Sequence, residues 1–356
     1  MTGIHQLLVS ASRGDAVTDA AFAARQVLEL VGPSKIGARY WDRALDGEVL
    51  GLDELCAVAD AGDALIYHAS IGEPGFVEFV QSWDGPVILQ YHNMTPAAFF
   101  QEVDQTFAVR LTEGRLELAQ LLGRVDASIA PSSFNAEELA RLGYQDVRVV
   151  PLILDVQGLV DTEPTPSTMH HLAVSEGPVL FFLGQTLPHK RPDLLIRAYH
   201  LLVTYHRPDA RLVMAGPPRV PAYAEHLGRM IFELNLPGCW LAGQVTRSDV
   251  VAFYRSATAF VTASEHEGVC LPLIEAMGFG VPVIARACTA IPETLGGAGL
   301  LLPDDAGPAL MCEAMLAVIE DHDLHQDLVR AGRERLAQLR PEVAGAGLLA
   351  ALADVL

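Results

Sequence analysis

The sequence lacks several features that would place it in particular classes of proteins. No uninterrupted apolar run reaches the roughly 18–20 residues that a membrane-spanning helix requires. The N-terminus has neither the charged region nor the cleavage site of a secretory signal. The 5 cysteines are odd in number, widely spaced and without a C-x-x-C pair, which argues against a disulfide framework and against a zinc site. We therefore expect a cytoplasmic protein with reduced thiols and no integral membrane segment.

Basic residues are also scarce. The chain has 24 Lys and Arg against 44 Asp and Glu, for a formal net charge of −20. A surface of this sign repels the phosphates of nucleic acids and of anionic lipids, so neither is an expected partner. An anion could bind only where a local cluster of donors holds it.

Apolar residues are abundant, at 51% of 356 residues, which predicts two domains with a core each. Short β-branched runs alternate with segments of helical periodicity, a pattern typical of parallel sheets covered on both faces. The expected strands are 5–10, 63–70, 86–93, 127–132 and 147–154 in the first half, and 179–184, 211–216, 239–245, 259–264, 282–287 and 299–303 in the second.

A stretch rich in Pro, Thr and Ser at 155–178 interrupts this alternation. We expect an N-terminal Rossmann-like domain over 1–160, a linker over 161–177 and a C-terminal Rossmann-like domain over 178–340. Residues 341–356 are expected to form a helix that packs back on the N-terminal domain. Ligands of such sheets bind beyond the carboxyl ends of the strands, so the cleft between the domains is the expected site.

The segment EHEGVCLPLIEAMGFGVPVI, residues 265–284, predicts an anion-binding turn. Pro272 suits the start of a helix, so residues 268–271 would present backbone N–H groups and a helix N-terminus to a phosphate. Glu267 before the turn and Glu275 inside the helix could bind hydroxyls on either side of that anion, which suits a nucleotide sugar. Taken singly, Glu267 is more simply a solvated loop residue, and Glu275 a complement to the helix dipole.

The same segment resembles the E-x7-E signature of retaining glycosyltransferase family 4. Similar segments occur in order along nearly the whole chain: GDAV (14–17), YHNMTP (91–96), APSSFNAEELARLGY (130–144), FFLGQTLPHKRPDLLIRA (181–198), RLVMAG (211–216), LAGQVTRSDVVAFYRSATAFVTAS (241–264) and IPETLGGAGLL (291–301). The resemblance implies the GT-B fold, an α/β architecture of two Rossmann-like, doubly wound domains that face each other across a cleft. The N-terminal domain would lie on the acceptor side, and the C-terminal domain would bind the nucleotide sugar.

The resemblance also implies roles for residues of the second half. Glu267 corresponds to the glutamate that contacts the hydroxyls of the donor sugar, and Glu275 to the residue that holds the ribose diol. Lys190 corresponds to the lysine that neutralises the leaving diphosphate, a role suited to a compact charge on a long side chain. The sugar and diphosphate would be held by the backbone amides of Gly268, Val269, Cys270 and Leu271. Cys270 itself is expected to be a small packed residue and not a nucleophile.

Gln185 is a departure from the family, which usually has arginine directly after the glycine of the phosphate loop. Glutamine can donate a hydrogen bond to the donor but carries no charge. Either Lys190 and the helix terminus suffice, or Arg191 or another residue compensates, or turnover is slow.

In the first half, His92 resembles the active-site histidine that the family places near the transferred sugar. Gly14 and Asp15 follow the first strand, where the resemblance places a turn against the donor phosphate or the acceptor. An ordinary β–α turn explains these two residues equally well. The D-x-D motif at 321–323 lies between two helical segments, and we assign it no metal.

These expectations describe a retaining hexosyltransferase that uses a nucleotide diphosphate sugar as co-substrate. Its acceptor would be a hydroxyl of a sugar, a glycan or a small molecule, in the synthesis of a bacterial surface polysaccharide, another glycoconjugate or a natural product. No metal or other cofactor is expected. A nucleotide-sugar epimerase or a phosphorylase of the same fold, or a non-catalytic nucleotide-sugar-binding protein, is the alternative. The nucleobase, the sugar, the acceptor and a homo-oligomer are left open.

Overall fold

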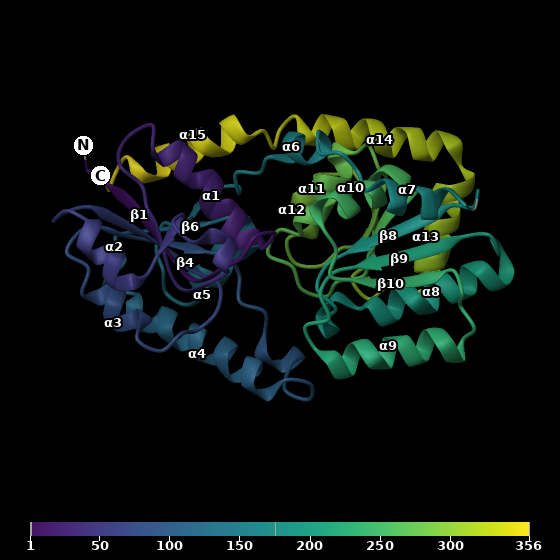
Figure 1. Cartoon of the computed structure of the whole chain (residues 1–356), viewed down its shortest axis with the longest axis horizontal. Coiled ribbons are helices and arrows are strands. Elements are labelled where there is room, and N and C mark those ends of the chain that lie inside the picture. The colour runs from purple at the N-terminus through teal and green to yellow at the C-terminus, as the bar shows by residue number, and fades with distance from the viewer. Residues whose placement is uncertain (1, 175, 356) are drawn as a thin grey trace. The chain divides into compact units, whose positions relative to one another are not determined.

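The computed structural model describes residues 2–174 and 176–355, which form two α/β units (Figure 1). Unit 1 comprises Met1–Asp155 and Leu339–Leu356, and unit 2 comprises Val156–Gln338. The chain thus returns to unit 1 at its end, where helix α15 (Pro341–Leu352) contacts helix α1 (Ala16–Leu28).

Unit 1 is built on a seven-stranded parallel sheet of order β3-β2-β1-β4-β5-β6-β7. The strands are β1 (Ile4–Ala11), β2 (Ile36–Trp41), β3 (Val49–Leu50), β4 (Ala64–Ala69), β5 (Val87–Tyr91), β6 (Ala127–Ala130) and β7 (Arg148–Val149). The sequence pattern did not predict β2 and β3. These strands lie at one edge of the sheet, and β2 carries the partly exposed Arg39 and Tyr40 in place of a continuous apolar run.

Helices cover both faces of the unit 1 sheet. One face packs against α1 and α15 through a cluster that includes Ile66, Ile88 and Leu348. The opposite face packs against other helices of this unit through a cluster that includes Tyr67 and Leu118. The remaining helical segments of this unit are η1 (Arg43–Leu45), α2 (Leu52–Val58), α3 (Phe76–Gln81), η2 (Ala97–Phe99), α4 (Gln105–Leu121) and α5 (Ser133–Arg141).

Unit 2 is built on a six-stranded parallel sheet of order β10-β9-β8-β11-β12-β13. The strands are β8 (Val179–Leu183), β9 (Arg211–Ala215), β10 (Cys239–Gly243), β11 (Ala259–Thr262), β12 (Val283–Arg286) and β13 (Leu300–Leu302). All six strands expected in the second half of the sequence are therefore present. Their buried apolar runs made them easy to recognise.

Two helical layers enclose this second sheet. One face packs against α8, α9 and α13, and the other against α7, α10, α11 and α12, while α14 contacts both α13 and α11. The bounds of these segments are α6 (Val156–Val160), α7 (Pro166–Ala173), η3 (Pro188–Lys190), α8 (Pro192–Tyr205), α9 (Pro221–Glu233), α10 (Arg247–Ser256), α11 (Leu271–Gly278), α12 (Ile291–Leu295), α13 (Pro308–Glu320) and α14 (His322–Leu336).

The segment expected as a linker, 161–177, contains a helix. Helix α7 begins at Pro166 within this segment and packs against α10. Its Leu172 is only 4% exposed and belongs to the core of unit 2. The proline that suggested a linker in fact occupies the first turn of a helix, where its missing N–H group has no cost.

Both sheets reverse their strand order at one point. In unit 1 the reversal lies between β1 and β4, and in unit 2 between β8 and β11. Connections leave in opposite directions there, so a crevice opens at the carboxyl ends of the two strands. The loops that follow these four strands are therefore the places to look for a site.

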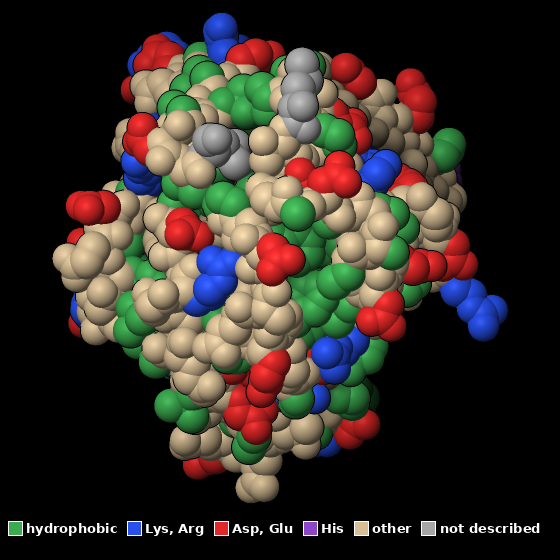
Figure 2. Space-filling view, turned by 90° about the vertical axis from the view of Figure 1, so that its left-hand side faces the viewer, with side chains coloured by type: hydrophobic (Ala, Val, Ile, Leu, Met, Phe, Trp, Pro, Cys, Tyr) green, Lys and Arg blue, Asp and Glu red, His purple; other side chains and the backbone are tan. Residues whose placement is uncertain are grey.

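Figure 2 shows one face of the molecule in a space-filling view. Acidic and basic side chains are interspersed on this face among apolar and neutral ones. A continuous basic surface, as nucleic-acid binding requires, does not form on the face in view.

Candidate functional site

Lys190 and Glu267 meet at the strand reversal of unit 2. Lys190 ends the short helix η3 after β8, and Glu267 lies in the loop after β11. The Lys190 ammonium donates hydrogen bonds to both carboxylate oxygens of Glu267, at 2.7 and 2.8 Å. Burial disfavours the ammonium, but the attraction of Glu267 outweighs it and raises the pKa of Lys190. The ammonium is therefore charged at neutral pH.

The turn after Glu267 presents unused backbone donors. Cys270 adopts a left-handed conformation with φ of 65° and caps α11, whose first turn contains Pro272. Within the described part of the chain, the N–H groups of Val269, Cys270 and Leu271 make no hydrogen bond. Successive free amides at a helix N-terminus form a site for an anion. The structure thus brings the predicted turn next to the predicted lysine.

Thr289 holds the backbone of Glu267 in place. Its hydroxyl accepts a hydrogen bond from the Glu267 N–H at 2.8 Å and donates one to the Glu267 carbonyl at 2.8 Å. Thr289 has φ of 44°, a conformation that is rare for a β-branched residue and costs on the order of 1–3 kcal/mol. Such strain persists only where neighbouring interactions enforce it. The sequence pattern did not identify this residue, although it lies in the loop after β12, beyond the carboxyl end of a strand, where ligands of such sheets bind.

Glu275 is oriented by Tyr254. The Tyr254 hydroxyl donates to Glu275 Oε2 at 2.9 Å and lies 3.1 Å from the Pro272 carbonyl. Tyr254 is fully buried, and burial together with Glu275 raises its pKa well above the usual value, so it remains a donor. The half-buried Glu275 is therefore fixed on the first turns of α11, as a ligand group would need to be.

Cys270 is a packed residue. It is 8% exposed, and burial, followed by the charge of Glu267, raises the pKa of its thiol well above the usual value. Cys288 has the same character, because burial raises its pKa to about 12 and its thiol lies 2.8 Å from the Ser264 carbonyl. Neither thiol is poised for nucleophilic chemistry.

Gln185 carries no charge, and the nearby Arg191 is already paired with acidic residues. Gln185 is exposed, and within residues 2–174 and 176–355 its side chain makes no hydrogen bond. Arg191 is bonded to Asp193 at 3.1 Å and to Glu265, and these bonds raise its pKa further. Its charge is therefore already compensated, which weakens it as a replacement for the family arginine.

In unit 1, His92 lies directly after β5 and is joined to two buried polar residues. Its Nε2 is 2.7 Å from His68 Nδ1, and His68 Nε2 is 2.9 Å from Gln6 Oε1. Burial lowers the pKa of His92 to about 4, so the ring is neutral at physiological pH. The sequence pattern missed Gln6 and His68 because each occupies one position of an otherwise apolar strand.

Gly14 and Asp15 occupy the turn after β1. Gly14 has φ of 79°, which suits glycine, and is exposed. The Asp15 carboxylate accepts a hydrogen bond from the Thr18 N–H at 3.0 Å and caps α1. The carboxylate thus has a structural role, and contact of this turn with a donor stays a prediction.

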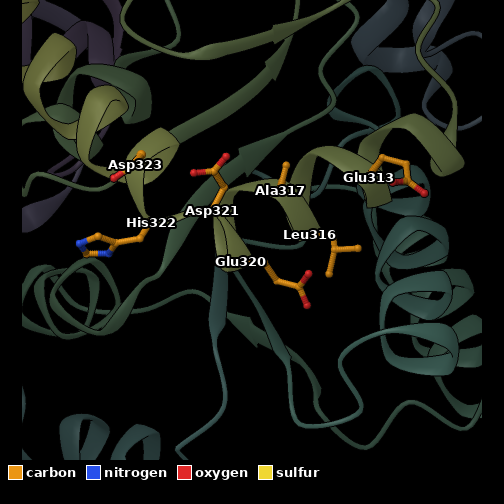
Figure 3. A pocket seen from close by; sticks show the side chains of 7 residues that line it. All are labelled: Glu313, Leu316, Ala317, Glu320, Asp321, His322 and Asp323. Carbon is orange, nitrogen blue, oxygen red and sulfur yellow. The ribbon is translucent and has the colours of Figure 1, made fainter.

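A pocket of about 600 Å³ lies elsewhere in unit 2, where α13 ends and α14 begins. Its lining side chains point in different directions (Figure 3). Asp321 caps α14 by accepting from the Leu324 N–H at 2.9 Å. Because α13 runs back from the carboxyl end of β13, its end lies near the amino ends of the strands, whereas Lys190 follows the carboxyl end of β8. Among the described residues, no group of three or more His, Cys, Asp or Glu could hold a metal.

Residues 169–335 match the family model described as glycosyl transferases group 1. The chain is 26% identical over 258 residues to a D-inositol 3-phosphate glycosyltransferase of Kineococcus radiotolerans, covering 67% of this chain and 59% of that protein. It is 28% identical over 197 residues to O-antigen chain mannosyltransferase B of Escherichia coli, covering 53% and 51%. It is 28% identical over 187 residues to a GDP-mannose-dependent alpha-mannosyltransferase of Mycolicibacterium smegmatis, covering 52% and 44%. The matched segments thus span about half the length of these curated relatives.

Two solved structures resemble the chain along its whole length. HepE of Anabaena, in complex with UDP and glucose, has a TM-score of 0.81 at 14% identity, covering 99% of this chain and 100% of that one. Sucrose-phosphate synthase from Thermosynechococcus elongatus has a TM-score of 0.75 at 17% identity, covering 99% of each chain. At such identities the likeness concerns the fold alone.

No helix in the described residues has the length and apolarity needed to cross a membrane. The expected α/β architecture is confirmed by the two parallel sheets and their helical layers. The chain has a GT-B-like fold of two α/β units, and residues 169–335 are similar to glycosyl transferases of group 1.

Proposed function

We propose that this protein is a retaining, metal-independent glycosyltransferase that moves a hexosyl unit from a nucleotide diphosphate sugar to a hydroxyl acceptor. The observation that carries the proposal is the grouping, at the strand reversal of unit 2, of an ammonium, a carboxylate and three unused amides. The named activities of the relatives support a hexosyl donor. Synthesis of a bacterial surface glycan, another glycoconjugate or a natural product, in the cytoplasm, is the proposed setting.

Each group of this site has a task in the proposed reaction. The N–H groups of residues 269–271 and the Lys190 ammonium hold the diphosphate, Glu275 holds the ribose diol, and Glu267 contacts hydroxyls of the transferred sugar. Charge accumulates on the diphosphate as it leaves, so donors already in place lower the barrier. His92 of unit 1 contacts a sugar substrate.

The chemical step exchanges one bond at the anomeric carbon for another. The bond from this carbon to the diphosphate oxygen breaks, and a bond to the acceptor oxygen forms on the same face. The acceptor's proton passes to the departing diphosphate, which acts as the base. No protein nucleophile is required, in contrast to hydrolysis by two flanking carboxylates. Cys270, with its protonated thiol, is not placed for one.

The proposal is tested by donor binding followed by turnover. Thermal-shift screening against UDP-, GDP-, ADP- and dTDP-sugars identifies the donor, because a ligand that binds only the folded state raises the melting temperature. The donor is then incubated with a panel of hydroxyl acceptors, and the anomeric configuration of the product is read by NMR. Retention of configuration is expected, and inversion would contradict the mechanism.

Two controls separate the alternatives. Turnover of the donor without an acceptor would indicate an epimerase. Formation of a sugar phosphate in the presence of inorganic phosphate would indicate a phosphorylase. Donor binding without turnover across the panel would indicate a binding protein. Activity should also survive a chelator, and its loss would contradict metal independence. Glu275→Ala should weaken nucleotide binding, and unchanged affinity would refute the role given to this residue.

A further inference from the structure

A line of polar side chains crosses the apolar face of the unit 1 sheet that packs against α1 and α15. The strand register explains the line. Gln6 pairs with Ile66, so His68 lies two residues further on the same face. His68 in turn pairs with Gln90, so His92 lies two residues beyond that. The three side chains therefore step diagonally across β1, β4 and β5 toward the carboxyl ends.

The start of the line determines which way its hydrogen bonds run. Gln6 Nε2 donates to the Ala21 carbonyl of α1 at 3.0 Å. A carbonyl oxygen can only accept, so the amide nitrogen of Gln6 must face α1 and its oxygen must face His68. His68 Nε2, at 2.9 Å from that oxygen, must therefore carry a hydrogen. Gln6 is fully buried, so no water competes for these bonds.

The next step follows from the neutrality of His68. This ring is 1% exposed, and burial and then His92 lower its pKa well below the usual value. A neutral imidazole has one N–H group, and here that group is on Nε2. His68 Nδ1 is then an acceptor, and the hydrogen of the 2.7 Å bond belongs to His92 Nε2.

The rings meet edge to edge, as such a bond requires. Their planes differ by 18° and their centroids are 5.0 Å apart, far more than the 2.7 Å between the bonded nitrogens. His92 is itself neutral, since burial lowers its pKa to about 4. Its second nitrogen, Nδ1, is left with a lone pair. In the described part of the chain, no group donates a hydrogen bond to this atom.

A network that served folding alone would end on protein groups at both ends, because buried polar atoms without partners are costly. This one ends on the Ala21 carbonyl at one end and on a partly exposed acceptor at the other. The bond of Gln6 to the Ala21 carbonyl therefore determines which nitrogen of His92 carries the hydrogen.

We propose that Gln6 and His68 are positioning residues that hold His92 in the Nε2–H tautomer, so that His92 accepts a hydrogen bond from a substrate hydroxyl through Nδ1. The choice of a hydroxyl-bearing substrate rests on the proposed function, whereas the tautomer does not. In this state His92 cannot donate to the substrate. The protein should therefore bind a substrate that has this hydroxyl more tightly than an analogue with hydrogen or fluorine in its place.

The tautomer is measured directly by NMR on the full chain with 15N-labelled histidine. Long-range proton–nitrogen spectra distinguish a protonated from an unprotonated ring nitrogen, and the His92 signals are assigned by their loss in His92→Phe. The expected result at neutral pH is an unprotonated Nδ1 and a protonated Nε2. A protonated Nδ1, or an even mixture of tautomers, would overturn the proposal.

Gln6→Met tests the relay and Gln90→Met is its control. Both remove a buried amide from the same face of the sheet, but Gln90 makes no hydrogen bond to either histidine in the described structure. Gln6→Met should convert His92 to a mixture of tautomers, and Gln90→Met should leave the Nε2–H form. Equal spectra for the two variants would contradict a relay. His68→Phe, which keeps an aromatic ring but removes the acceptor, should also release His92 if Gln6→Met does not fold.

The activity arm uses a donor and acceptor pair that turns over. Gln6→Met should lower kcat/KM about tenfold, the equivalent of one hydrogen bond, whereas Gln90→Met should not. A deoxy or fluoro analogue at the contacted hydroxyl should lose as much with the wild type and nothing further with Gln6→Met. If every analogue behaves alike in the two proteins, substrate recognition by Nδ1 is refuted. If the tautomer is as expected but no sugar is transferred, the proposed function fails and the positioning role of Gln6 and His68 stands.

Discussion

Glu267→Gln should strengthen the binding of a free nucleoside diphosphate while it lowers turnover. In the structure the Lys190 ammonium is paired with the Glu267 carboxylate, whose side chain is only 8% exposed. A diphosphate that binds at Lys190 must either displace this carboxylate or share the ammonium with it. Removing the negative charge eliminates that competition.

The size of the effect follows from the geometry of the pair. At 2.7 to 2.8 Å, two unit charges attract by about 6 kcal/mol at an effective dielectric constant of 20, and by about 1.5 kcal/mol in water. The Lys190 side chain is 21% exposed, and the diphosphate replaces part of the lost attraction. We therefore expect a gain near the lower value, which corresponds to about tenfold tighter binding. Turnover should nevertheless fall, because glutamine no longer offers a carboxylate to the sugar hydroxyls.

Isothermal titration of the nucleoside diphosphate measures the affinity, and the coupled transferase assay measures kcat. Glu313→Gln is the control for net charge, since Glu313 lines the distant pocket at the end of α13. In a Lys190→Ala background, Glu267→Gln should no longer tighten binding, because the ammonium with which Glu267 interacts is absent. Unchanged or weaker binding by Glu267→Gln would show that Lys190 does not hold the diphosphate.

Three further predictions concern neighbouring features of the two units. Thr289→Val should lower donor affinity about tenfold through loss of the hydroxyl that holds Glu267, whereas Thr289→Ser should retain it; equal titration curves for the two variants would rule out the hydroxyl. Gln185→Arg should raise kcat about tenfold by adding a cation after β8, and a kcat no higher than that of Gln185→Met would mean that the site lacks no charge. Burial lowers the pKa of His92 from 6.5 to about 4, so unfolding consumes protons in this range and stability should fall as the pH drops from 6.5 to 4. This residue accounts for up to about 3 kcal/mol of that loss, and denaturant titrations of His92→Gln should show a flatter dependence in the same window.

Most of the fold could be predicted because its strands are continuous apolar runs. Both faces of a parallel sheet are covered, so strands such as β8 and β11 stand out without any alternation of polar residues. β3, at the edge of its sheet, has only two residues, and its neighbour β2 carries the polar Arg39 in place of a continuous apolar run, so both strands were missed. The helix α7 was missed for a different reason: composition alone does not distinguish a proline in a loop from a proline in the first turn of a helix, as at Pro166.

The site could be predicted only where its residues are close in sequence. The turn from Glu267 to Glu275 is a local motif, and the structure places it at a helix N-terminus as local rules require. That Lys190 bonds to Glu267 could not be predicted, because the two are 77 residues apart and meet only through the pairing of β8 with β11. The sequence suggested separate contacts with the donor for these two residues. Their mutual bond means that Glu267 and the diphosphate compete for the Lys190 ammonium, which no sequence motif indicates.

The sequence shows Gln6 and His68 as polar residues within apolar strands, but it does not show which groups they contact. A glutamine within HQLLVS and a histidine within DALIYHAS are visible as polar interruptions of apolar strands. Both faces of this sheet are covered, so the partner of such a residue is unknown until the strand order and register are known. The register puts both residues on the face that packs against α1 and α15, where each must find a partner. A polar residue in the middle of a strand next to the reversal of a parallel sheet therefore indicates a link to the site at the carboxyl ends of the strands, and it becomes interpretable only once the pairing of that strand is established.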